Sequence, residues 1–423
     1  MSKNKRTNTI LIIILAAGLL LRLILGYSYP PYPETMKDWA QRIVETGFSG
    51  FYGPEVQWPY PPLYLYILWV LGLILKIFNI SDPGMRELVI ELPPILCDIC
   101  AAYLLWRVAK PRLDEKKALI LVAAYVFNPA IIHNSCMWGQ TDSVFTLAVA
   151  MMCVFLCEEK LLQAFICFGA GLMLKQQTLT FAPVLMVAIV EQVFLADHGD
   201  GSAVEKTMFF NRRTVPMIGW GMAVIAGMIL ISIPFGLGEM FKQYLSVQSG
   251  MPYVSVGAYN FWMLVNRGWC SLDTTFIGIP CGTWGKLAII GITLLCFILA
   301  FFYRKSEKKY PLLGAALILP VFCFATGMHE RYMLSGLLLL ALAFIYKPSK
   351  AMMAFYICFS LLQLANTVFV YGFALQDGFA ALAGIQDKIE KLFSFGDFAA
   401  TVCFVIYLFV GGLREYKAEK GQQ

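Results

Sequence analysis

Charged residues are scarce in this sequence. Only 14% of its 423 residues are Asp, Glu, Lys or Arg, whereas 59% are hydrophobic and the mean hydropathy is +0.68. A soluble chain could not bury so many apolar runs, because a single core stops growing at about 250–300 residues. These values are typical of polytopic membrane proteins. The net charge of +6 does not indicate nucleic-acid binding, since the basic residues cluster at the ends of apolar segments and mark topology.

Histidine is nearly absent, with three residues, and neither a pair of CxxC motifs nor HExxH occurs. We therefore expect no bound metal and no organic cofactor. Most of the twelve cysteines lie in apolar segments, where cysteine acts as a small hydrophobe. Cys270 and Cys281 instead share one polar loop, where either a disulfide or two free thiols are compatible with the sequence.

The chain also lacks an internal repeat of 20–50 residues, a low-complexity tract and a small-residue cleavage site after its first apolar segment. We expect that segment, from Thr9 to Gly26, to remain as a signal anchor, and residues 1–423 to form a single integral membrane domain. The missing repeat argues against a transporter or lipid flippase, which is the rival class.

Thirteen apolar segments predict an all-α polytopic fold. They run approximately over 9–26, 62–80, 88–109, 117–135, 142–157, 160–174, 178–196, 214–235, 285–303, 310–326, 332–346, 350–373 and 396–413. The strongly basic connectors should all be cytoplasmic, yet three segments separate Arg6 from the connector that begins at Arg107. Three crossings would put these two basic regions on opposite sides of the membrane. We therefore expect the helix 62–80, which opens at Pro61-Pro62, to lie against the outer face without crossing. The prediction is about twelve transmembrane helices with both termini cytoplasmic.

This topology places two long loops, 27–87 and 236–284, on the extracytoplasmic side. Within the second, the apolar stretch from Tyr253 to Val265 is expected to dip to the membrane surface as a short helix. Six pieces of polar sequence should meet on this face. They are Tyr29–Pro62, Trp138–Ser143, Lys175–Gln177, 236–284, Gly327–Tyr332 and 374–395.

The first external loop carries two acids, Glu34 and Asp38, four residues apart. They share one face if a helix begins after Pro33. A carboxylate near an apolar surface is a good general base, because desolvation raises its pKa towards neutrality. The alternative is that both acids are ordinary first-turn charges that offset a helix dipole.

The turn from Trp138 to Ser143 opens an apolar segment. Trp138, Gln140 and Asp142 could hold a sugar by stacking and paired hydrogen bonds. Helix capping by Asp142 and Ser143 would explain the same residues.

Three ionisable residues in succession, His329, Glu330 and Arg331, separate two apolar segments and precede Tyr332. Such groups are costly at membrane depth and usually functional. A guanidinium beside a histidine suits a phosphate, to which it gives forked hydrogen bonds. The alternative is a surface ion pair of Glu330 with Arg331 or Lys175.

Other polar residues interrupt the apolar segments. Lys175, next to Gln176 and Gln177, could add a second positive charge for an anionic head group or simply snorkel. Asp98, with Glu87 and Glu91, either lines the same cavity or pairs internally. Asn366 is expected to link helices.

In this order the motifs resemble those of the GT-C superfamily of polyprenyl-phosphate-sugar-dependent glycosyltransferases. The nearest likeness is to the glucosyltransferases that extend the dolichol-linked N-glycan precursor, and to their bacterial relatives. The resemblance spans nearly the whole chain. The residues that carry it are Trp39 with the acids before it, Tyr60-Pro61-Pro62-Leu63, Asn128-Pro129, Trp138-Gly139-Gln140-Thr141-Asp142-Ser143, Lys175-Gln176-Gln177, Asn260-Phe261-Trp262 and His329-Glu330-Arg331-Tyr332.

The resemblance implies an inverting hexosyltransferase that uses an acid of the first external loop and, in this branch, usually no metal. Relatives typically carry an aspartate about seven residues before the position of Trp39, and bacterial ones often another just before Tyr-Pro-Pro. Here those positions hold Tyr32 and Pro59. The base is therefore Glu34 or Asp38, with Glu34 preferred, and an inactive relative is the second rival.

The same likeness predicts the partners. They are a polyprenyl-phosphate sugar donor, a lipid-linked or cell-envelope glycan acceptor and membrane lipids, with no nucleic acid. The substrate-binding residues implied are Tyr60, Trp138, Gln140, Asp142, Lys175, Gln177, His329, Glu330, Arg331 and Tyr332. Short connectors suit a bacterial plasma membrane, with the active site outside the cytoplasm.

Overall fold

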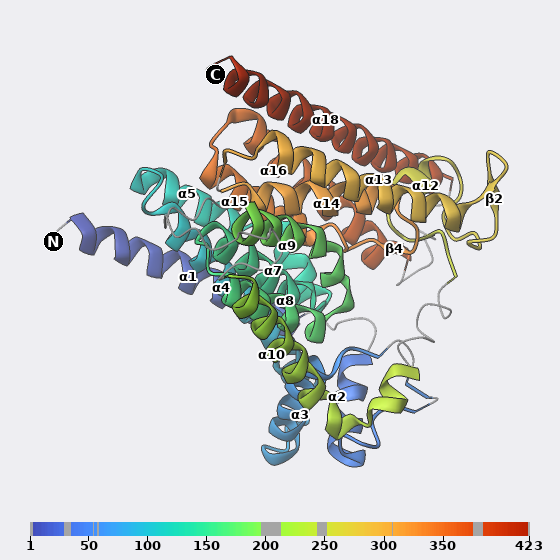
Figure 1. The fold of residues 1–423 in the computed structure, drawn as a ribbon. Helices are drawn as coiled ribbons and strands as arrows, with labels where there is room; N and C mark the ends of the chain where they lie inside the picture. Colours follow the sequence, from blue (N-terminus) through green and yellow to red (C-terminus); the bar gives the residue numbers. More distant parts are fainter. Residues whose placement is uncertain are drawn as a thin grey trace.

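The structure, a computed structural model, describes residues 3–28, 35–53, 55–56, 59–195, 213–242, 252–306, 308–374 and 384–421. Nearly all of the regular structure is helical (Figure 1). The longer helices are α1 (Lys3–Ser28), α2 (Thr35–Thr46), α3 (Pro62–Ile77), α4 (Pro83–Ala109), α5 (Glu115–Val126), α7 (Asp142–Cys157), α8 (Leu161–Leu174), α10 (Thr214–Ser232), α13 (Cys281–Phe302), α14 (Tyr310–Phe324), α15 (Leu334–Tyr346), α16 (Lys350–Phe369) and α18 (Gln386–Lys420).

Shorter pieces extend or connect these helices. They are α6 (Pro129–Ile132), α9 (Ala182–Ile189), α12 (Phe261–Leu264), the π-helices η1 (His133–Met137), η3 (Val190–Leu195) and η5 (Val370–Ala374), and the 3₁₀ helices η2 (Gln176–Phe181) and η4 (Ile233–Phe235). The strands are β1 (Ser255–Val256), β2 (Thr275–Phe276), β3 (Ile279–Pro280) and β4 (Met328–His329). β1 pairs with β4 in parallel, and β2 with β3 in an antiparallel hairpin.

The predicted all-α polytopic membrane fold is confirmed. In the described part of the chain, eight helices are long and apolar enough to cross a membrane, and five shorter apolar helices accompany them. Together they correspond to the thirteen predicted segments. The helix 62–80 does begin at Pro62, with Pro61 at its N-cap. That this helix lies against the outer face without crossing stays a prediction, as does the count of twelve crossings.

The centre of the bundle is formed by α7, α14 and α15. Every residue of α14 from Tyr310 to Cys323 is buried, as is every residue of α15 from Leu334 to Ala343. A helix that is apolar on all sides is stable only when neighbours cover its whole circumference. The peripheral α1 and α10 are largely exposed instead. In the most apolar stretch of each helix, only 22% of the residues of α1 and 11% of those of α10 are buried. These exposed apolar flanks fit a lipid environment.

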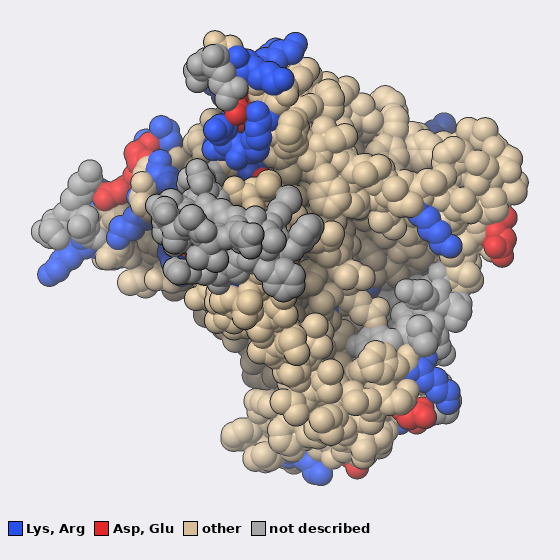
Figure 2. Space-filling model, in the orientation of Figure 1, with Lys and Arg blue, Asp and Glu red and all other residues tan. Residues whose placement is uncertain are grey.

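Charge is distributed unevenly over the surface. Figure 2 shows Lys and Arg gathered toward the end where α1 begins and α18 ends, with smaller groups at the opposite rim and a nearly uncharged belt between them. The start of α1 lies at the left of Figure 1 and the end of α18 near its top, whereas β2 and β4 lie toward the right and α2 toward the bottom. A chain with both termini cytoplasmic requires such an arrangement, but the sidedness stays a prediction.

Asp98 pairs internally and does not line the site. Arg22 Nε of α1 lies 3.0 Å from Asp98 Oδ2 of α4, and both side chains are 0% exposed. Ser135 donates to the same carboxylate oxygen at 2.7 Å, and Arg22 also donates to the Val126 carbonyl at 2.8 Å. Nearer the start of α4, Glu87 forms an ion pair with Lys37 of α2.

The predicted short helix in the stretch 253–265 forms as α12. The stretch packs against the bundle, with Asn260 and Trp262 buried, and its position at the membrane surface stays a prediction. Asn260 Nδ2 donates to the Phe322 carbonyl at 2.9 Å, and Trp262 Nε1 donates to that of Phe324 at 3.0 Å. The loop is thus fixed to the end of α14, because its polar groups satisfy carbonyls that a helix end leaves without partners. Cys270 and Cys281 are both free thiols, so no disulfide links them.

Candidate active site

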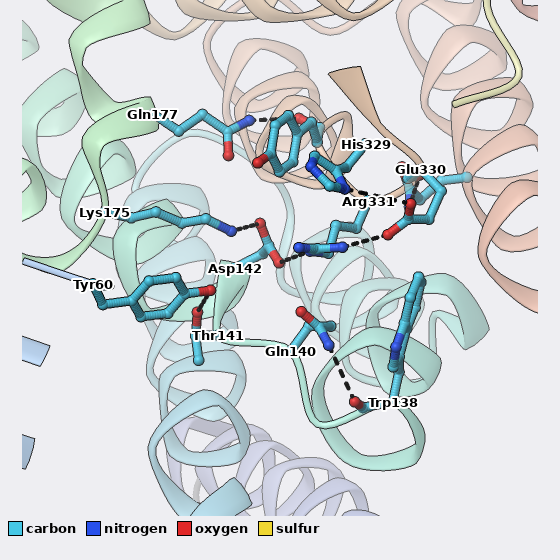
Figure 3. Close-up of polar contacts among 12 residues, drawn as sticks. Tyr60, Trp138, Gln140, Thr141, Asp142, Lys175, Gln177, His329, Glu330 and Arg331 are labelled. Atoms are coloured by element: carbon cyan, nitrogen blue, oxygen red, sulfur yellow. Dashed lines mark hydrogen bonds and ion pairs between the residues drawn. The ribbon is translucent and has the colours of Figure 1, made fainter. Parts of the chain in front are cut away.

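Asp142, the first residue of α7, is the centre of a buried charge cluster (Figure 3). Lys175 Nζ lies 2.6 Å from its Oδ1, and Arg331 Nε lies 3.5 Å from its Oδ2, so that the two cations approach from opposite sides. Asp142 is 1% exposed and Lys175 is 7% exposed. The capping alternative is wrong, because Thr141 occupies the N-cap without a side-chain cap bond and Asp142 binds cations instead.

The local backbone explains why Asp142 points inward. The preceding helix ends in the π-helical turn η1, and Gly139 adopts φ +65°, which a residue with a Cβ rarely adopts. The backbone N–H of Gln140 then donates to the Asn134 carbonyl at 2.8 Å. This tight reversal places the first turn of α7 beside Lys175, which lies in extended backbone between α8 and η2.

The turn after β4 supplies the second cation. Arg331 forms an ion pair with Glu330, whose side chain is only 4% exposed, and His329 Nδ1 lies 3.8 Å from Glu330 Oε2. The predicted alternative of a surface ion pair is therefore wrong, because the pair is buried. Gln363 of α16 donates to the Glu330 carbonyl at 3.1 Å and so fixes the turn to a central helix.

Aromatic rings enclose both cations. The Arg331 guanidinium lies 5.6 Å from the ring centroids of both Trp138 and Tyr332. Lys175 Nζ lies 5.2 Å from the Tyr332 centroid and 5.8 Å from that of Tyr60. Such contacts favour a cation most where water is excluded. Lys175 therefore does not snorkel to the surface, which excludes that alternative.

Burial changes the protonation of this cluster. It holds the pKa of His329 well below its usual range, and the positive charges of Arg331 and Lys175 act in the same direction. Burial also raises the pKa of Glu330, against the opposing effect of Arg331. For Lys175 burial is the largest single effect and would lower the pKa, but the Asp142 carboxylate together with Tyr60 and Tyr332 outweighs it, and the pKa is raised. His329 is therefore neutral near pH 7 and can only donate or accept a hydrogen bond.

In this state the charges of the cluster nearly cancel. Two cations, Lys175 and Arg331, meet two carboxylates, Asp142 and Glu330. An incoming phosphate would offer the guanidinium a bidentate partner in place of Glu330. Arg331 is 17% exposed and His329 is 15% exposed, whereas Asp142 is 1% exposed. The accessible side of the cluster is thus its cationic and imidazole side.

The remaining predicted substrate-binding residues adjoin this cluster. Tyr60 accepts a hydrogen bond from Thr141 Oγ1 at 3.0 Å. Gln177 donates to the Tyr332 carbonyl at 3.2 Å, and Gln140 is buried with Nε2 3.4 Å from the Trp138 carbonyl. The structure brings Tyr60, Trp138, Gln140, Asp142, Lys175, Gln177, His329, Glu330, Arg331 and Tyr332 to one end of the bundle.

The two candidate bases are placed differently. Asp38 lies in the first turn of α2 and is exposed, with its neighbour Trp39 buried. The Trp39 ring packs edge-on against that of Tyr60 at 5.5 Å, which connects α2 to the cluster. Glu34 lies outside the described residues. The exposed position of Asp38 in the first turn of α2 is compatible with a catalytic role and with a helix-dipole role.

Gln363 and Asn134 near the site escaped the sequence argument, and Asn366 was expected in another role. Gln363 and Asn366 lie three apart on α16, a spacing that could have indicated a polar face. Asn366 does not link helices as expected. It accepts from the Tyr259 N–H at 3.0 Å and donates to the Gly257 carbonyl at 2.7 Å, and so holds the loop that carries β1. Asn134 is fully buried, and its side-chain amide has no hydrogen-bond partner in the described part of the chain.

Among the described residues, no group of three or more His, Cys, Asp or Glu side chains is arranged to hold a metal ion. Besides its two carboxylates, Asp142 and Glu330, the site contains two cations, aromatic rings and neutral donors. Its more exposed groups, Arg331 and His329, suit an anion.

Two comparisons with known proteins support the resemblance drawn from the motifs. Residues 60–209 match the family model described as dolichyl-phosphate-mannose-protein mannosyltransferase. This region includes Tyr60, Asp142 and Lys175 but not Arg331. The chain is also 25% identical over 355 residues to a probable dolichyl pyrophosphate Man9GlcNAc2 alpha-1,3-glucosyltransferase of Schizosaccharomyces pombe.

That alignment covers 74% of this chain and 64% of the yeast protein, so the chain spans slightly less than two thirds of the length of its relative. Both matches are to glycosyltransferases whose names refer to dolichyl-linked sugars. The predicted resemblance to the GT-C superfamily is thereby confirmed. The bacterial plasma membrane stays a prediction, and the relative is eukaryotic.

Proposed function

We propose that this chain is a GT-C type glycosyltransferase that moves a sugar from a polyprenyl-phosphate carrier to a hydroxyl of a lipid-linked or cell-envelope glycan. The reaction takes place at the extracytoplasmic face. The observation that carries this proposal is the meeting of two cations, the buried Lys175 and the half-buried Arg331, on Asp142 at one end of an apolar bundle. A lipid carrier reaches such a site from the bilayer, with its chain among the exposed apolar helices and its phosphate at the cations.

The leaving group is the carrier phosphate, and its negative charge grows as the bond to the anomeric carbon breaks. Arg331 binds the phosphate oxygens after it turns from Glu330, and Lys175 provides the second charge. His329, which is neutral, donates one hydrogen bond. Asp142 holds the two cations in place before the donor arrives, so little reorganisation is needed at the moment of reaction. This role replaces the sugar-binding role that the sequence suggests for Asp142.

The acceptor hydroxyl attacks the anomeric carbon from the side opposite the phosphate, and this direction inverts the configuration. Glu34 takes the proton from that hydroxyl, with Asp38 as the second candidate. The packing of Trp39 against Tyr60 supports a location of the first loop beside the phosphate site. Trp138 and Gln140 are the nearest groups for stacking on the sugar and for hydrogen bonds to its hydroxyls.

The decisive experiment measures product formation by the purified full chain from a prenyl-phosphate sugar and a lipid-linked glycan acceptor. The name of the yeast relative makes prenyl-phosphate glucose the first donor to test. Product with inverted anomeric configuration is the expected result. Donor binding without product would identify an inactive relative. Movement of the lipid-linked sugar between leaflets without chemistry would identify a flippase.

The base is tested with Glu34→Gln and Asp38→Asn. Loss of the base should slow transfer by about 10²–10⁴-fold with little change in donor affinity. Glu45→Gln is the matched control. Glu45 lies exposed on α2, the helix that carries Asp38, and its described hydrogen bond is with Gln41. Unchanged turnover in both Glu34→Gln and Asp38→Asn would show that neither acid is the base.

A further inference from the structure

A second charged cavity lies at the other end of the bundle. It has a volume of about 350 Å³ and is lined by Leu156, Glu159, Glu191, Gln192, Leu195, Arg213, Arg304, Lys305, Lys309 and Tyr310. Leu156 is near the last turn of α7, whereas Asp142 is the first residue of that helix. Sixteen helical residues span about 24 Å. The cavity is therefore separate from the Asp142 site.

Positive charge exceeds negative charge in this cavity. Four basic residues of its lining face two acidic ones, Glu159 and Glu191, which leaves an excess of two. Glu419 of α18 lies outside the lining and offsets one more charge, because it pairs with Arg304 at 2.9 Å and lies 3.8 Å from Lys305. Among these described groups, one positive charge is in excess when all of them are ionised.

Hydrogen bonds give the cavity a defined shape. Lys309 is buried, and its Nζ lies 2.9 Å from Glu191 Oε2, which also accepts from the Tyr310 hydroxyl at 3.2 Å. Gln192 donates to the Leu156 carbonyl at 2.9 Å, and Arg213 donates to the Gln192 carbonyl at 2.9 Å. These bonds tie η3 and the start of α10 to α7 and α14, so Lys309 and Arg213 are held at the cavity before a ligand binds.

Two leucines, Leu156 and Leu195, form an apolar part of the described lining. Leu195 is 62% exposed at the edge of the cavity, and the adjoining α10 has only 11% of its most apolar window buried. The cavity thus joins a cationic wall to a flank that suits acyl chains. A free anion uses only the first of these surfaces, whereas a phospholipid uses both.

We propose that this cavity binds the headgroup phosphate of an anionic membrane phospholipid, in the leaflet at the end of the bundle remote from Asp142. The phosphate lies among Arg213, Arg304 and Lys305, and the acyl chains extend along Leu195 and α10. This proposal is independent of the transferase reaction. It predicts a selective lipid partner for the protein even in a variant that transfers no sugar.

The test uses the purified full chain in nanodiscs and native mass spectrometry to compare binding of phosphatidylglycerol with binding of phosphatidylcholine. Arg213→Gln and Lys305→Gln should each lower the preference for phosphatidylglycerol about fivefold, since one basic residue near an anionic headgroup contributes about 1 kcal/mol. Lys350→Gln is the control, because it removes the same charge from an exposed residue at the start of α16 that does not line the cavity.

Three outcomes would overturn the proposal. The first is equal binding of the two lipids by the unaltered protein. The second is an equal loss in Lys350→Gln, which would show a diffuse attraction of the whole positively charged end. The third is displacement of phosphatidylglycerol by inorganic phosphate at comparable concentration, which would identify the ligand as a free anion. Melting temperatures of the three variants within a few degrees of the unaltered protein verify that each is folded.

Discussion

The molecule contains two buried ion clusters of different construction. In the first, Arg22 and Asp98 are both 0% exposed within the helical spans, and Ser135 satisfies part of the carboxylate. In the second, Asp142 is equally buried, but it shares two cations with Glu330, and Arg331 remains 17% exposed. One cluster is closed on all sides, and the other has an accessible cationic side.

This difference separates structure from chemistry. A fully enclosed pair cannot exchange partners, so Arg22 and Asp98 serve to join α1, α4 and the end of α5. At the second cluster Glu330, which pairs with Arg331, can give way to a ligand phosphate, and aromatic rings flank both cations. We therefore interpret a buried ion cluster as a candidate functional site when one of its charged groups is partly exposed and has several partners. We interpret it as structural when both members of the pair are fully buried.

The largest effect is expected from breaking the sealed pair. Asp98→Asn leaves Arg22 as an uncompensated buried charge, which should lower the free energy of unfolding by about 3–5 kcal/mol. Transfer per folded molecule should not change. Thermal unfolding in detergent and turnover normalised to folded protein are the measurements. Asp387→Asn is the control, because Asp387 is 74% exposed and its pair with Lys391 contributes little. A loss of turnover larger than the loss of folded protein would contradict the structural role.

Arg331→Lys tests the open cluster. Lysine keeps the charge but cannot give a forked bond to phosphate. We expect turnover to fall by about 10²–10³-fold, as for the loss of one transition-state donor, with a melting temperature near that of the unaltered protein. Steady-state kinetics measures this effect. The same exchange at Arg107, which is 53% exposed in a pair with Glu158, should leave turnover unchanged. Normal turnover in Arg331→Lys would exclude Arg331 from the phosphate site.

Asn366→Ala tests how the open cluster is supported. The substitution leaves the Gly257 carbonyl and the Tyr259 N–H without their partner, which should cost about 1–3 kcal/mol of stability. Because β1 pairs with β4, the change should reach His329 and raise the KM for the donor. Thermal unfolding and donor titration are the two measurements. Unchanged stability would mean that the second loop is held to the bundle by other contacts.

The smallest expected effect is a pH dependence of stability. His329 has a pKa of about 6.5 in the unfolded chain and a much lower one in the folded protein, where Glu330, Arg331 and Lys175 surround it. Below pH 6.5 the unfolded chain therefore binds a proton that the folded protein does not. Stability should fall with pH from about 6.5 downward by up to about 1.4 kcal/mol per pH unit from this residue. The raised pKa of Glu330 acts in the opposite direction as pH falls.

His329→Gln isolates this contribution from that of Glu330. The variant should lose stability less steeply than the unaltered protein between about pH 6.5 and 5, measured by thermal unfolding across a pH series. Parallel pH profiles would show that His329 takes up its proton in the folded protein.

Hydropathy located the helices well because a span must satisfy its own backbone hydrogen bonds, whatever its neighbours are. The start of α3 depends on a local residue, Pro62. By contrast, the apolar composition of the stretch 253–265 does not indicate how it packs against the bundle. Its packing depends on Asn260 and Asn366, whose partners lie 62 and 107 residues away along the chain. Local composition carries no information about such partners.

Long apolar segments and short polar motifs are local features of a chain. The sequence alone therefore indicates a polytopic helical membrane protein whose motifs resemble those of the GT-C superfamily. Only the folded structure shows which charged residues of the chain pair with one another. It assigned Asp98 to Arg22, and Asp142 to Lys175 and Arg331, although each of the two aspartates lies in an apolar helix. The physical reason is that a buried charge must find a compensating partner, and packing, rather than order along the chain, determines which partner is within reach.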